Sequence, residues 1–420
     1  ATALLFVGFT SSCSDFLDRY PLDELSDSSF WKTENDAMMA VTDIYGCLPT
    51  WDQDEDINSD NAVHGIKWAA GNISKGVYDP MDQSWAGSYT PIRQCNLVLE
   101  KVKDIEMSDE SRKKIEGQAY FFRAFVYFNL IRSFGDVPYI DKPLNLTDVE
   151  DITRTPREEV YAKVMADFDK AIEYLPEEWD AANTPRVTKG AALAMKARAA
   201  LYYNNWQVAA DASKAVMDLG KYELYDAGNT GKYQELFWEK SDGCDENILY
   251  VQFNYPDKTH YLIGWECFPT LGWGGMNPTQ SLVDAFEDKD GAPISKSTIY
   301  NEKDPFKNRD PRLEVNVLHD GEEMYGVTIK VKPLKSSGKT GIEQHGDATA
   351  TGYYQQKWLD PSIDPQSEGW NMGKDWVVIR YAEVLSLCLQ GFSAPSSTPA
   401  SANCRYCWPA FYTPVSTSPR

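Results

Sequence analysis

The feature that most constrains the fold is a strongly periodic apolar stretch between residues 115 and 134. Its sequence, "IEGQAYFFRAFVYFNLIRSF", repeats apolar residues at spacings of three and four. The repeating positions are Ile115, Ala119, Phe122, Val126 and Leu130. This spacing predicts a long helix with one apolar face, and Gly135 directly after it is a typical helix C-terminal residue. A helix of this kind needs other helices or a sheet to cover its apolar face.

A second helix is predicted in "TPREEVYAKVMADFDKAIEYLP", which follows a marked start signal. Thr155 is expected to cap the helix, Pro156 to take its first position, and Glu158 to close a capping box. One side carries a regular apolar row, Val160, Val164, Phe168 and Ile172. The segment therefore supplies a second amphipathic helix.

Two further helices are predicted in residues 187–224. Thr188 is expected to cap the first, Asn204 and Asn205 to break the run before Trp206, and Gly220 to end the second. Small residues allow the two helices to approach closely, as in a tetratricopeptide unit. Because one such unit cannot bury its own apolar face, we expect residues 30–225 to form one helical block.

Strand signals are few and short. They occur in "NILYVQFNY", "VTIKVKPL" and "WVVIRY", all in the second half of the chain. The fold class predicted is therefore mostly α, with a scaffold of tetratricopeptide-like helix pairs, a loop-rich remainder and minor β-hairpins.

The N-terminus indicates export. An apolar run, "ALLFVGF", is followed by small polar residues and Cys13, as in a truncated lipoprotein signal. We expect processing at Cys13, with lipid on its thiol and amine, because several acyl chains give durable membrane anchoring. Beyond this segment no apolar run has the eighteen or more residues of a membrane-spanning helix.

Charge and motifs exclude several classes of protein. The formal net charge is −22, with no basic cluster, which argues against nucleic-acid binding. "SSGKT" has proline at position 333 where a phosphate loop needs glycine, and GxSxG and HExxH do not occur. The four histidines are isolated, and residues 52–63 lack the glycine and glutamate of a calcium loop. We expect no metal, no cofactor and a solvated acidic loop at residues 52–63.

The segment "GQAYFFRAFVYFNLIRSFGDVPYI" resembles the signature helix and turn of the SusD/RagB family. Further segments that match the family follow in order along residues 13–385. They are "CSDFLDRYP", "TPREEVYAKVMADFDKAIEYLP", "RVTKGAALAMKARAALY", "NPTQSLVDAFEDKDG", "RDPRLEVNVL", "GYYQQKW" and "VVIRYAEVL". Each is weak alone, but their common order makes the resemblance specific.

The resemblance implies a non-catalytic, nutrient-binding lipoprotein at the outer-membrane surface of Bacteroidetes, used in starch or polysaccharide utilisation. It implies an oligosaccharide ligand and a partner, a SusC-like TonB-dependent transporter. The expected organisation is an anchor segment at 1–13, a SusD-like helical region at 14–235, an incomplete SusD/RagB region at 236–385 and an anomalous tail at 386–420.

Aromatic residues in two loop-like stretches are the candidate ligand site. Flat aromatic faces suit the apolar C–H face of a sugar ring, so we expect an aromatic platform joining the two stretches. Its members are Trp68, Trp265 and Trp273, with Tyr78 and Tyr261 as further candidates. Asp60 and Asn277 are candidates for binding sugar hydroxyls. The alternative for each aromatic residue is packing in the core beneath long loops.

Other functions remain open at this point. Some members of the family bind peptides, which would use main-chain hydrogen bonds. A glycoside hydrolase needs two carboxylates about 5–10 Å apart, and among 63 acidic residues such a pair can arise by chance. A tetratricopeptide scaffold that grips a protein tail would instead place its ligand residues on the helices.

The tail at 386–420 differs from the rest of the chain. It contains no aspartate or glutamate and is rich in serine and proline, with three cysteines between positions 388 and 407. We interpret this change as a shift of reading frame near Leu385. A genuine divergent tail is the alternative, and sequencing of the locus distinguishes the two.

Overall fold

The computed structural model describes residues 30–50, 56–65, 76–77, 85–145, 151–225, 230–331 and 349–393. Its α-helices are α2 (Glu34–Ile44), α3 (Tyr89–Lys101), α4 (Asp109–Phe134), α5 (Arg157–Tyr174), α6 (Lys189–Tyr202), α7 (Trp206–Asp218), α8 (Thr230–Glu235), α9 (Leu262–Glu266), α10 (Gln280–Ala285), α11 (Arg312–Asn316) and α12 (Tyr381–Ser393). The strands are β1 (Ala62–His64), β2 (Asn247–Val251), β3 (Met276–Pro278), β4 (Val317–Leu318), β5 (Glu323–Met324), β6 (Val327–Thr328), β7 (Tyr354–Gln355) and β8 (Trp376–Arg380). The predicted mostly helical fold is confirmed.

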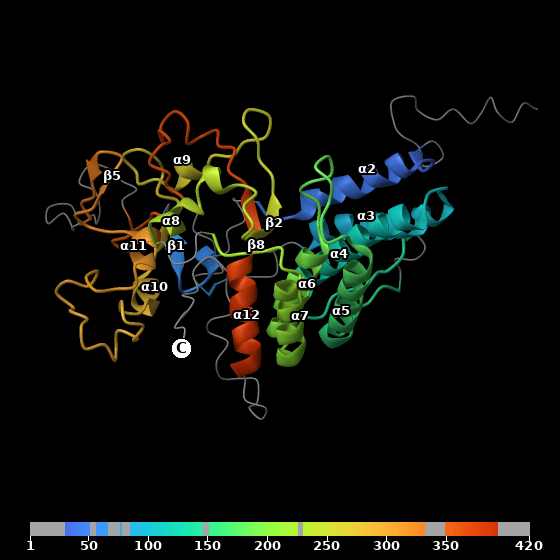
Figure 1. The fold of residues 1–420 in the computed structure, drawn as a ribbon, viewed down its shortest axis with the longest axis horizontal. Helices are drawn as coiled ribbons and strands as arrows, with labels where there is room; N and C mark the ends of the chain where they lie inside the picture. The colour runs from blue at the N-terminus through green and yellow to red at the C-terminus, as the bar shows by residue number, and fades with distance from the viewer. Residues whose placement is uncertain are drawn as a thin grey trace, which may run out of the picture.

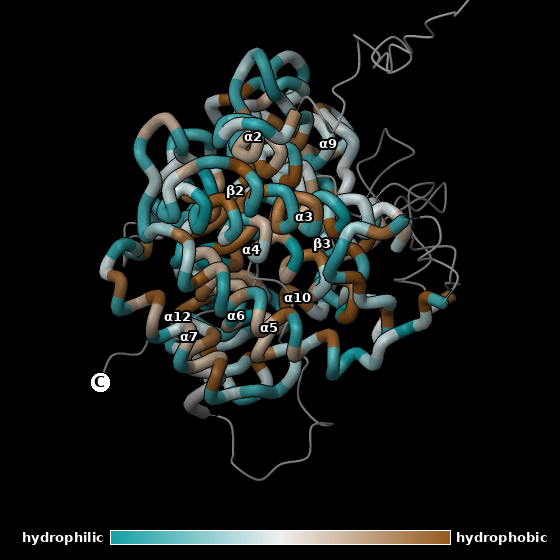
Figure 2. Tube along the Cα trace, turned by 90° about the vertical axis from the view of Figure 1, so that its right-hand side faces the viewer, coloured by the Kyte–Doolittle hydropathy of each residue, from teal (hydrophilic) through white to brown (hydrophobic). Residues whose placement is uncertain are grey.

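The long helices α2 to α7 pack side by side, with short elements and loops of the second half beside them (Figure 1). Helix α4 lies against both α3 and α5, and α6 packs on α5 and α7. Apolar and polar segments alternate along these helices in Figure 2, as expected for helices that cover one another. All five apolar positions predicted for the face of α4 are buried.

Most of the predicted helix ends are confirmed. Gly135 follows α4 with a φ of 73°, a conformation that glycine adopts without strain. The Thr188 side chain accepts a hydrogen bond from Ala191 N–H at the start of α6. Asn204 has a φ of 57° in the break between α6 and α7, and Gly220 follows α7 with a φ of 62°.

The predicted capping box of α5 is wrong. Pro156 precedes the helix, and Thr155 pairs with Val137 in a β-bridge instead of capping. The Asp136 carboxylate, from the turn after α4, accepts the Arg157 N–H at 2.9 Å. A residue that is distant in sequence thus supplies the cap, which local sequence cannot show.

A buried ion pair joins the three central helices. Arg123 on α4 donates two hydrogen bonds to Asp167 on α5, each 2.7 Å long, and a third of 2.8 Å to Asn96 on α3. The two charged side chains are each only 9% exposed. This bidentate geometry satisfies both charges within the helical core.

The strands form separate two-stranded antiparallel pairs, β1–β3, β2–β8, β4–β7 and β5–β6. In the described part of the stretch "VTIKVKPL", residues 327–331, the strand is limited to the two residues of β6. The pairs β1–β3, β2–β8 and β4–β7 connect segments that are far apart in sequence, whereas β5–β6 is a hairpin.

Helix α12 extends the helical layer at the end of the described chain (Figure 1). It packs against α7 and α6, and Leu387 is buried among small residues of those helices. Arg198 on α6 binds both carboxylate oxygens of Glu383 at 2.6 Å. The helix thus runs past position 385, while the proposed frame shift concerns the gene and stays a prediction.

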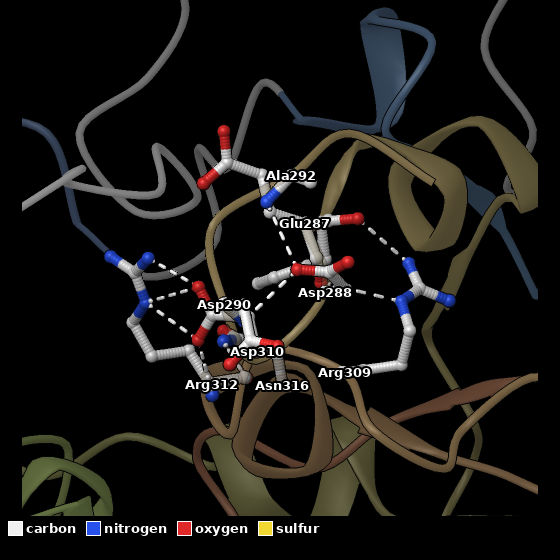
Figure 3. A network of polar contacts seen from close by, with 9 residues as sticks. Glu287, Asp288, Asp290, Ala292, Arg309, Asp310, Arg312 and Asn316 are labelled. Atoms are coloured by element: carbon white, nitrogen blue, oxygen red, sulfur yellow. Dashed lines mark hydrogen bonds and ion pairs between the residues drawn. The ribbon is translucent and has the colours of Figure 1, made fainter. Parts of the chain in front are cut away.

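The segments "NPTQSLVDAFEDKDG" and "RDPRLEVNVL" meet in a polar network at the end of α10 (Figure 3). Arg309 is buried and donates to the carbonyl oxygens of Val283, Phe286, Glu287 and Pro305. These acceptors include carbonyls left free by the end of a helix. Arg309 therefore fixes the end of α10 and the loop that follows.

We expect an Arg309→Lys variant to lose about 1–3 kcal/mol of unfolding free energy, because a lysine ammonium cannot reach these four carbonyl groups together. Urea unfolding followed by circular dichroism measures the change. Arg157→Lys is the matched control, since Arg157 is exposed and pairs with Glu158 on the surface. Equal stability of both variants would contradict the assigned role of Arg309.

Candidate functional site

The two loop-like stretches singled out in the sequence meet at the β1–β3 pair. Val63 lies opposite Asn277 and His64 opposite Met276. Beyond the last pair, Gly65 N–H donates to the Gly275 carbonyl at 3.0 Å. The chain after the first helix is therefore held beside the chain that precedes α10.

A cluster of four aromatic rings lies next to this junction, and we call it the aromatic platform. From here on the name denotes these four rings, Tyr261, Trp265, Trp273 and Trp370, of which Trp370 is not among the members predicted from the sequence. The Trp265 and Trp273 rings stack with centroids 5.7 Å apart and an interplanar angle of 17°. The Tyr261 and Trp370 rings stack at 6.0 Å and 23°. Edge contacts of 6.3 Å and 6.5 Å connect the two stacks.

Backbone hydrogen bonds hold the platform in place. Trp273 N–H donates to the Gly264 carbonyl at 3.2 Å, and Gly275 N–H to the Trp265 carbonyl at 2.9 Å. Gly264 N–H in turn donates to the Gly369 carbonyl at 2.9 Å, next to Trp370. The four rings thus come from three chain segments: α9 with the residue before it, and two turns whose backbones are hydrogen-bonded to α9.

Two glycines allow the rings to pack against the backbone. A Cβ atom at Gly264 would lie 2.4 Å from the Trp370 ring, and one at Gly275 would lie 2.2 Å from the Trp265 ring. Indole rings are rigid, so any larger residue at either position would displace a ring of the platform. The glycines of this stretch therefore have a packing role as well as a role in turns.

The platform is accessible to solvent. Trp273 is 45% exposed and Tyr261 is 42% exposed, while Trp265 and Trp370 are half-buried. Exposed, stacked aromatic rings that are held by backbone hydrogen bonds are typical of a binding surface. The arrangement offers the flat apolar faces of indole and phenol rings.

Comparisons with known protein families identify the chain. Residues 17–201 match a family model described as starch-binding and associating with the outer membrane. Residues 237–388 match the model of the SusD family. This chain belongs to the SusD/RagB family.

Relatives of the SusD/RagB family agree with this assignment. A SusD-like protein of Formosa agariphila is 29% identical over 257 residues, which are 57% of this chain and 50% of the relative. The chain thus spans about half the length of that curated relative. A crystal structure of a SusD-like protein from Bacteroides fragilis is 28% identical with a TM-score of 0.76, covering 89% of this chain and 77% of that one. A SusD-like carbohydrate-binding protein from the same species is 26% identical with a TM-score of 0.72, covering 86% of this chain and 74% of that one.

The predicted site residues of this SusD/RagB protein fall into two groups, those that the structure describes and those that it does not. Trp265, Trp273 and Tyr261 come together in the platform. Trp68, Tyr78 and the anchor residue Cys13 lie outside the described residues. The ligand-binding role of the platform residues stays a prediction.

The two polar candidates lie in different environments. Asn277 is fully buried, donates to the Gly274 carbonyl and accepts the Ala350 N–H. Its amide connects loops and has no free surface for a sugar. Asp60 is exposed, and its carbonyl oxygen accepts a hydrogen bond from the Thr279 hydroxyl, next to the Ala62–Pro278 end of the β1–β3 pair. Its role in ligand binding stays a prediction.

Sequence reasoning missed Trp370. It lies in "DPQSEGWNMGKDW", about a hundred residues after α9, and was assigned no role. The available signal was a tryptophan within a turn rich in glycine, proline and serine. Nothing local indicates that this turn packs on Gly264.

Asp56 corrects one expectation. The acidic loop is expected from the sequence to be solvated, but Asp56 is fully buried at the start of a short 3-10 helix.

His260 lies in the loop between β2 and α9 and is buried, with Nε2 2.8 Å from the Lys374 carbonyl. His260 lies beside Tyr261, and its backbone pairs with that of Met372 beside the Trp370 turn. It therefore supports two segments of the platform.

Burial of His260 is expected to lower the unfolding free energy of the protein as the pH falls. Burial lowers the pKa of His260 from 6.5 to about 4. Below pH 6.5 the unfolded chain takes up this proton while the folded protein does not, so unfolding becomes more favourable as the pH falls toward 4. Burial, with repulsion from Asp242, raises the pKa of Asp375 to about 6, which by itself makes the folded protein more stable as the pH falls through this range.

We expect the unfolding free energy of His260→Gln to decrease less between pH 6.5 and 4 than that of the wild type. Urea titrations across this range measure it, and parallel pH profiles would contradict it.

No helix among the described residues is long and apolar enough to cross a membrane. In the same part of the chain, no cluster of three or more histidine, cysteine, aspartate or glutamate side chains is arranged to hold a metal ion.

Proposed function

We propose that this protein is a non-catalytic, cell-surface glycan-binding lipoprotein that captures oligosaccharides at the aromatic platform. The observation that carries the proposal is the four-ring cluster beside the β1–β3 junction, held by backbone hydrogen bonds, in which Trp273 and Tyr261 are exposed. Sugar rings expose C–H faces that stack on indole and phenol rings, and this contact buries apolar area with little loss of side-chain freedom.

Family membership supports the ligand class. The matched family model describes starch-binding proteins, and a solved relative with a TM-score of 0.72 is described as carbohydrate-binding. A laminarin-binding SusD-like protein shares the fold with a TM-score of 0.67. A strongly acidic chain with a net charge of −22 also favours neutral glycans over anionic ones.

The proposal includes the location and the partner. Lipid on Cys13 would hold the protein at the outer-membrane surface, and a SusC-like TonB-dependent transporter would take over the captured glycan for uptake. Mass spectrometry of native protein tests the anchor, which an unmodified and unprocessed N-terminus would contradict. Co-purification from outer membranes tests the transporter.

A glycan array compared with a peptide library tests the ligand class. We expect retention of neutral oligosaccharides of at least several sugar units and no selective retention of peptides. Incubation of each bound glycan with the protein, followed by measurement of reducing ends, separates binding from hydrolysis. New reducing ends would show a glycosidase, and selective peptide binding would show the other ligand class.

A further inference from the structure

The aromatic platform supplies flat apolar faces, but a sugar also carries hydroxyl groups on the edge of its ring. Binding sites for small polar molecules place a few polar groups beside an apolar lining, and these groups fix the orientation of the bound molecule. Of the polar residues predicted from the sequence, Asn277 is fully buried and connects loops. The question is therefore which polar side chain lies at the surface of the platform itself.

Eight residues are adjacent in sequence to the four rings, and three of them have polar side chains: His260, Glu266 and Asn371. His260 is buried, with Nε2 2.8 Å from the Lys374 carbonyl oxygen. Glu266 is also buried, and its carboxylate accepts the Met276 N–H at 2.9 Å. Asn371 is exposed. It is therefore the polar neighbour of the rings that a ligand can reach from solvent.

The backbone places Asn371 beside Tyr261. His260 and Met372 form an antiparallel β-bridge with two hydrogen bonds. His260 N–H donates to the Met372 carbonyl at 3.0 Å, and Met372 N–H to the His260 carbonyl at 2.7 Å. Because the two segments run in opposite directions, the residue after His260 and the residue before Met372 come next to each other at the end of this bridge. These two residues are Tyr261 and Asn371.

Burial shows which side each pair faces. His260 and Met372 are buried, whereas Tyr261 and Asn371 are exposed. Successive side chains of an extended chain point to opposite sides, so the bridge pair faces the core and the next pair faces solvent. Asn371 also directly follows Trp370, whose ring stacks on that of Tyr261 with centroids 6.0 Å apart. Its amide therefore lies at the edge of the Tyr261–Trp370 stack.

The Asn371 amide is available to a ligand. Its side chain makes no hydrogen bond to the part of the chain that the structure describes, and its backbone N–H donates to the Glu368 carbonyl at 2.9 Å. Two acidic side chains of the same turn are engaged within it: Asp364 accepts the Ser367 hydroxyl at 2.7 Å, and Glu368 accepts the Asp364 N–H at 3.1 Å. An amide offers an acceptor oxygen and two N–H donors on one planar group, so it can bind two neighbouring hydroxyl groups of one sugar.

We propose that Asn371 is the residue of the platform that binds sugar hydroxyl groups and thereby selects among glycans that stack equally well on the rings. The inference rests on the proposed glycan binding at the platform. The ligand that fits is a neutral glycan with two adjacent free hydroxyl groups on the ring edge beside the Tyr261–Trp370 stack. The exposed carboxylates of Asp364 and Glu368 in the same turn disfavour a negatively charged sugar at this position.

The test is calorimetric titration of the full chain with five neutral hexasaccharides, maltohexaose, laminarihexaose, cellohexaose, xylohexaose and mannohexaose. Asn371→Ala and Asn371→Leu are titrated in parallel, and both replacements suit the backbone because Asn371 has no positive φ angle. We expect each variant to bind the best hexasaccharide about tenfold more weakly, through the loss of about one or two neutral hydrogen bonds. Both variants are expected to unfold at the same urea concentration as the wild type.

Asn35→Ala is the matched control. Asn35 is an exposed asparagine at the start of α2, which lies far from α9 (Figure 1). We expect this variant to bind like the wild type. Unchanged affinity in both Asn371 variants, or an equal loss in Asn35→Ala, would overturn the proposal.

A methylated ligand separates a direct contact from a structural role of Asn371. The O-methylated form of the best hexasaccharide keeps its C–H faces but has no hydroxyl donors. We expect methylation to weaken binding to the wild type more than binding to Asn371→Leu, because the variant already lacks the amide that the hydroxyl groups contact. Equal losses in the two proteins would overturn the direct contact.

Trp273→Ala, titrated with the same hexasaccharides, separates this inference from the proposed function. If binding depends on Trp273 but not on Asn371, the platform function stands and the inference fails. If binding depends on Asn371 but not on Trp273, the hydroxyl contact stands and the stacking role of the platform fails. If no hexasaccharide binds the wild type, both are overturned.

Discussion

Replacing Trp273 with alanine is expected to weaken oligosaccharide binding about thirtyfold while leaving the helical circular dichroism unchanged. Truncation of an aromatic residue at a binding surface commonly costs about 2 kcal/mol, which corresponds to this factor. Trp273 is the most exposed tryptophan of the platform, and its removal leaves the Trp265 ring without its stacking partner. Isothermal titration with the glycan that the array selects measures the effect.

Tyr255→Ala is the matched control for this experiment. Tyr255 is an exposed aromatic residue, 65% accessible, on the loop that leads from β2 toward α9, and it makes no ring contact with the platform. We expect the control to bind like the wild type. Unchanged affinity of Trp273→Ala, or an equal loss in Tyr255→Ala, would mean that the ligand binds elsewhere.

Trp265→Ala is also expected to weaken oligosaccharide binding, with a different effect on stability. Trp265 is half-buried and packs on Gly275, so its removal leaves space beneath the platform. We expect a lower unfolding midpoint for this variant and an unchanged one for Trp273→Ala. The comparison separates loss of the ligand contact from loss of local structure.

Asp167→Ala is expected to have the largest effect on stability, a loss of about 3–5 kcal/mol, because it leaves the Arg123 guanidinium buried without its countercharge. The expected result of urea unfolding is a much lower midpoint, with a cooperative transition if the domain still folds. The double variant Arg123→Met with Asp167→Leu removes both charges and is expected to recover most of this loss.

A surface pair provides the control for the ion pair. Lys214 and Asp218 on α7 lie 2.7 Å apart, with both side chains 60% exposed. Water screens such a pair, so Asp218→Ala is expected to change the unfolding midpoint little. A small effect of Asp167→Ala, similar to that of the surface variant, would show that the helices α4 and α5 are held by apolar packing alone.

The sequence by itself determined the helical half of this protein. The spacing of apolar residues over 115–134 gave the buried face of α4, and Thr188, Asn204 and Gly220 marked the ends of α6 and α7. These signals are local, because a helix buries one face at a fixed period and its ends need particular side chains or positive φ angles. The strands β2 and β8 were also recognised from a local signal, a short run of apolar and β-branched residues.

Only the tertiary structure decided the site. Trp265 and Trp273 are close in sequence, but their stack needs Gly275, and the cluster is completed by Trp370 from a turn far along the chain. Asn277 and His260, polar residues within loop-like sequence, turned out to be buried supports. Whether a loop residue is exposed depends on which distant segment covers it, and that is set by backbone hydrogen bonds and packing between segments, which leave no periodic pattern in the sequence.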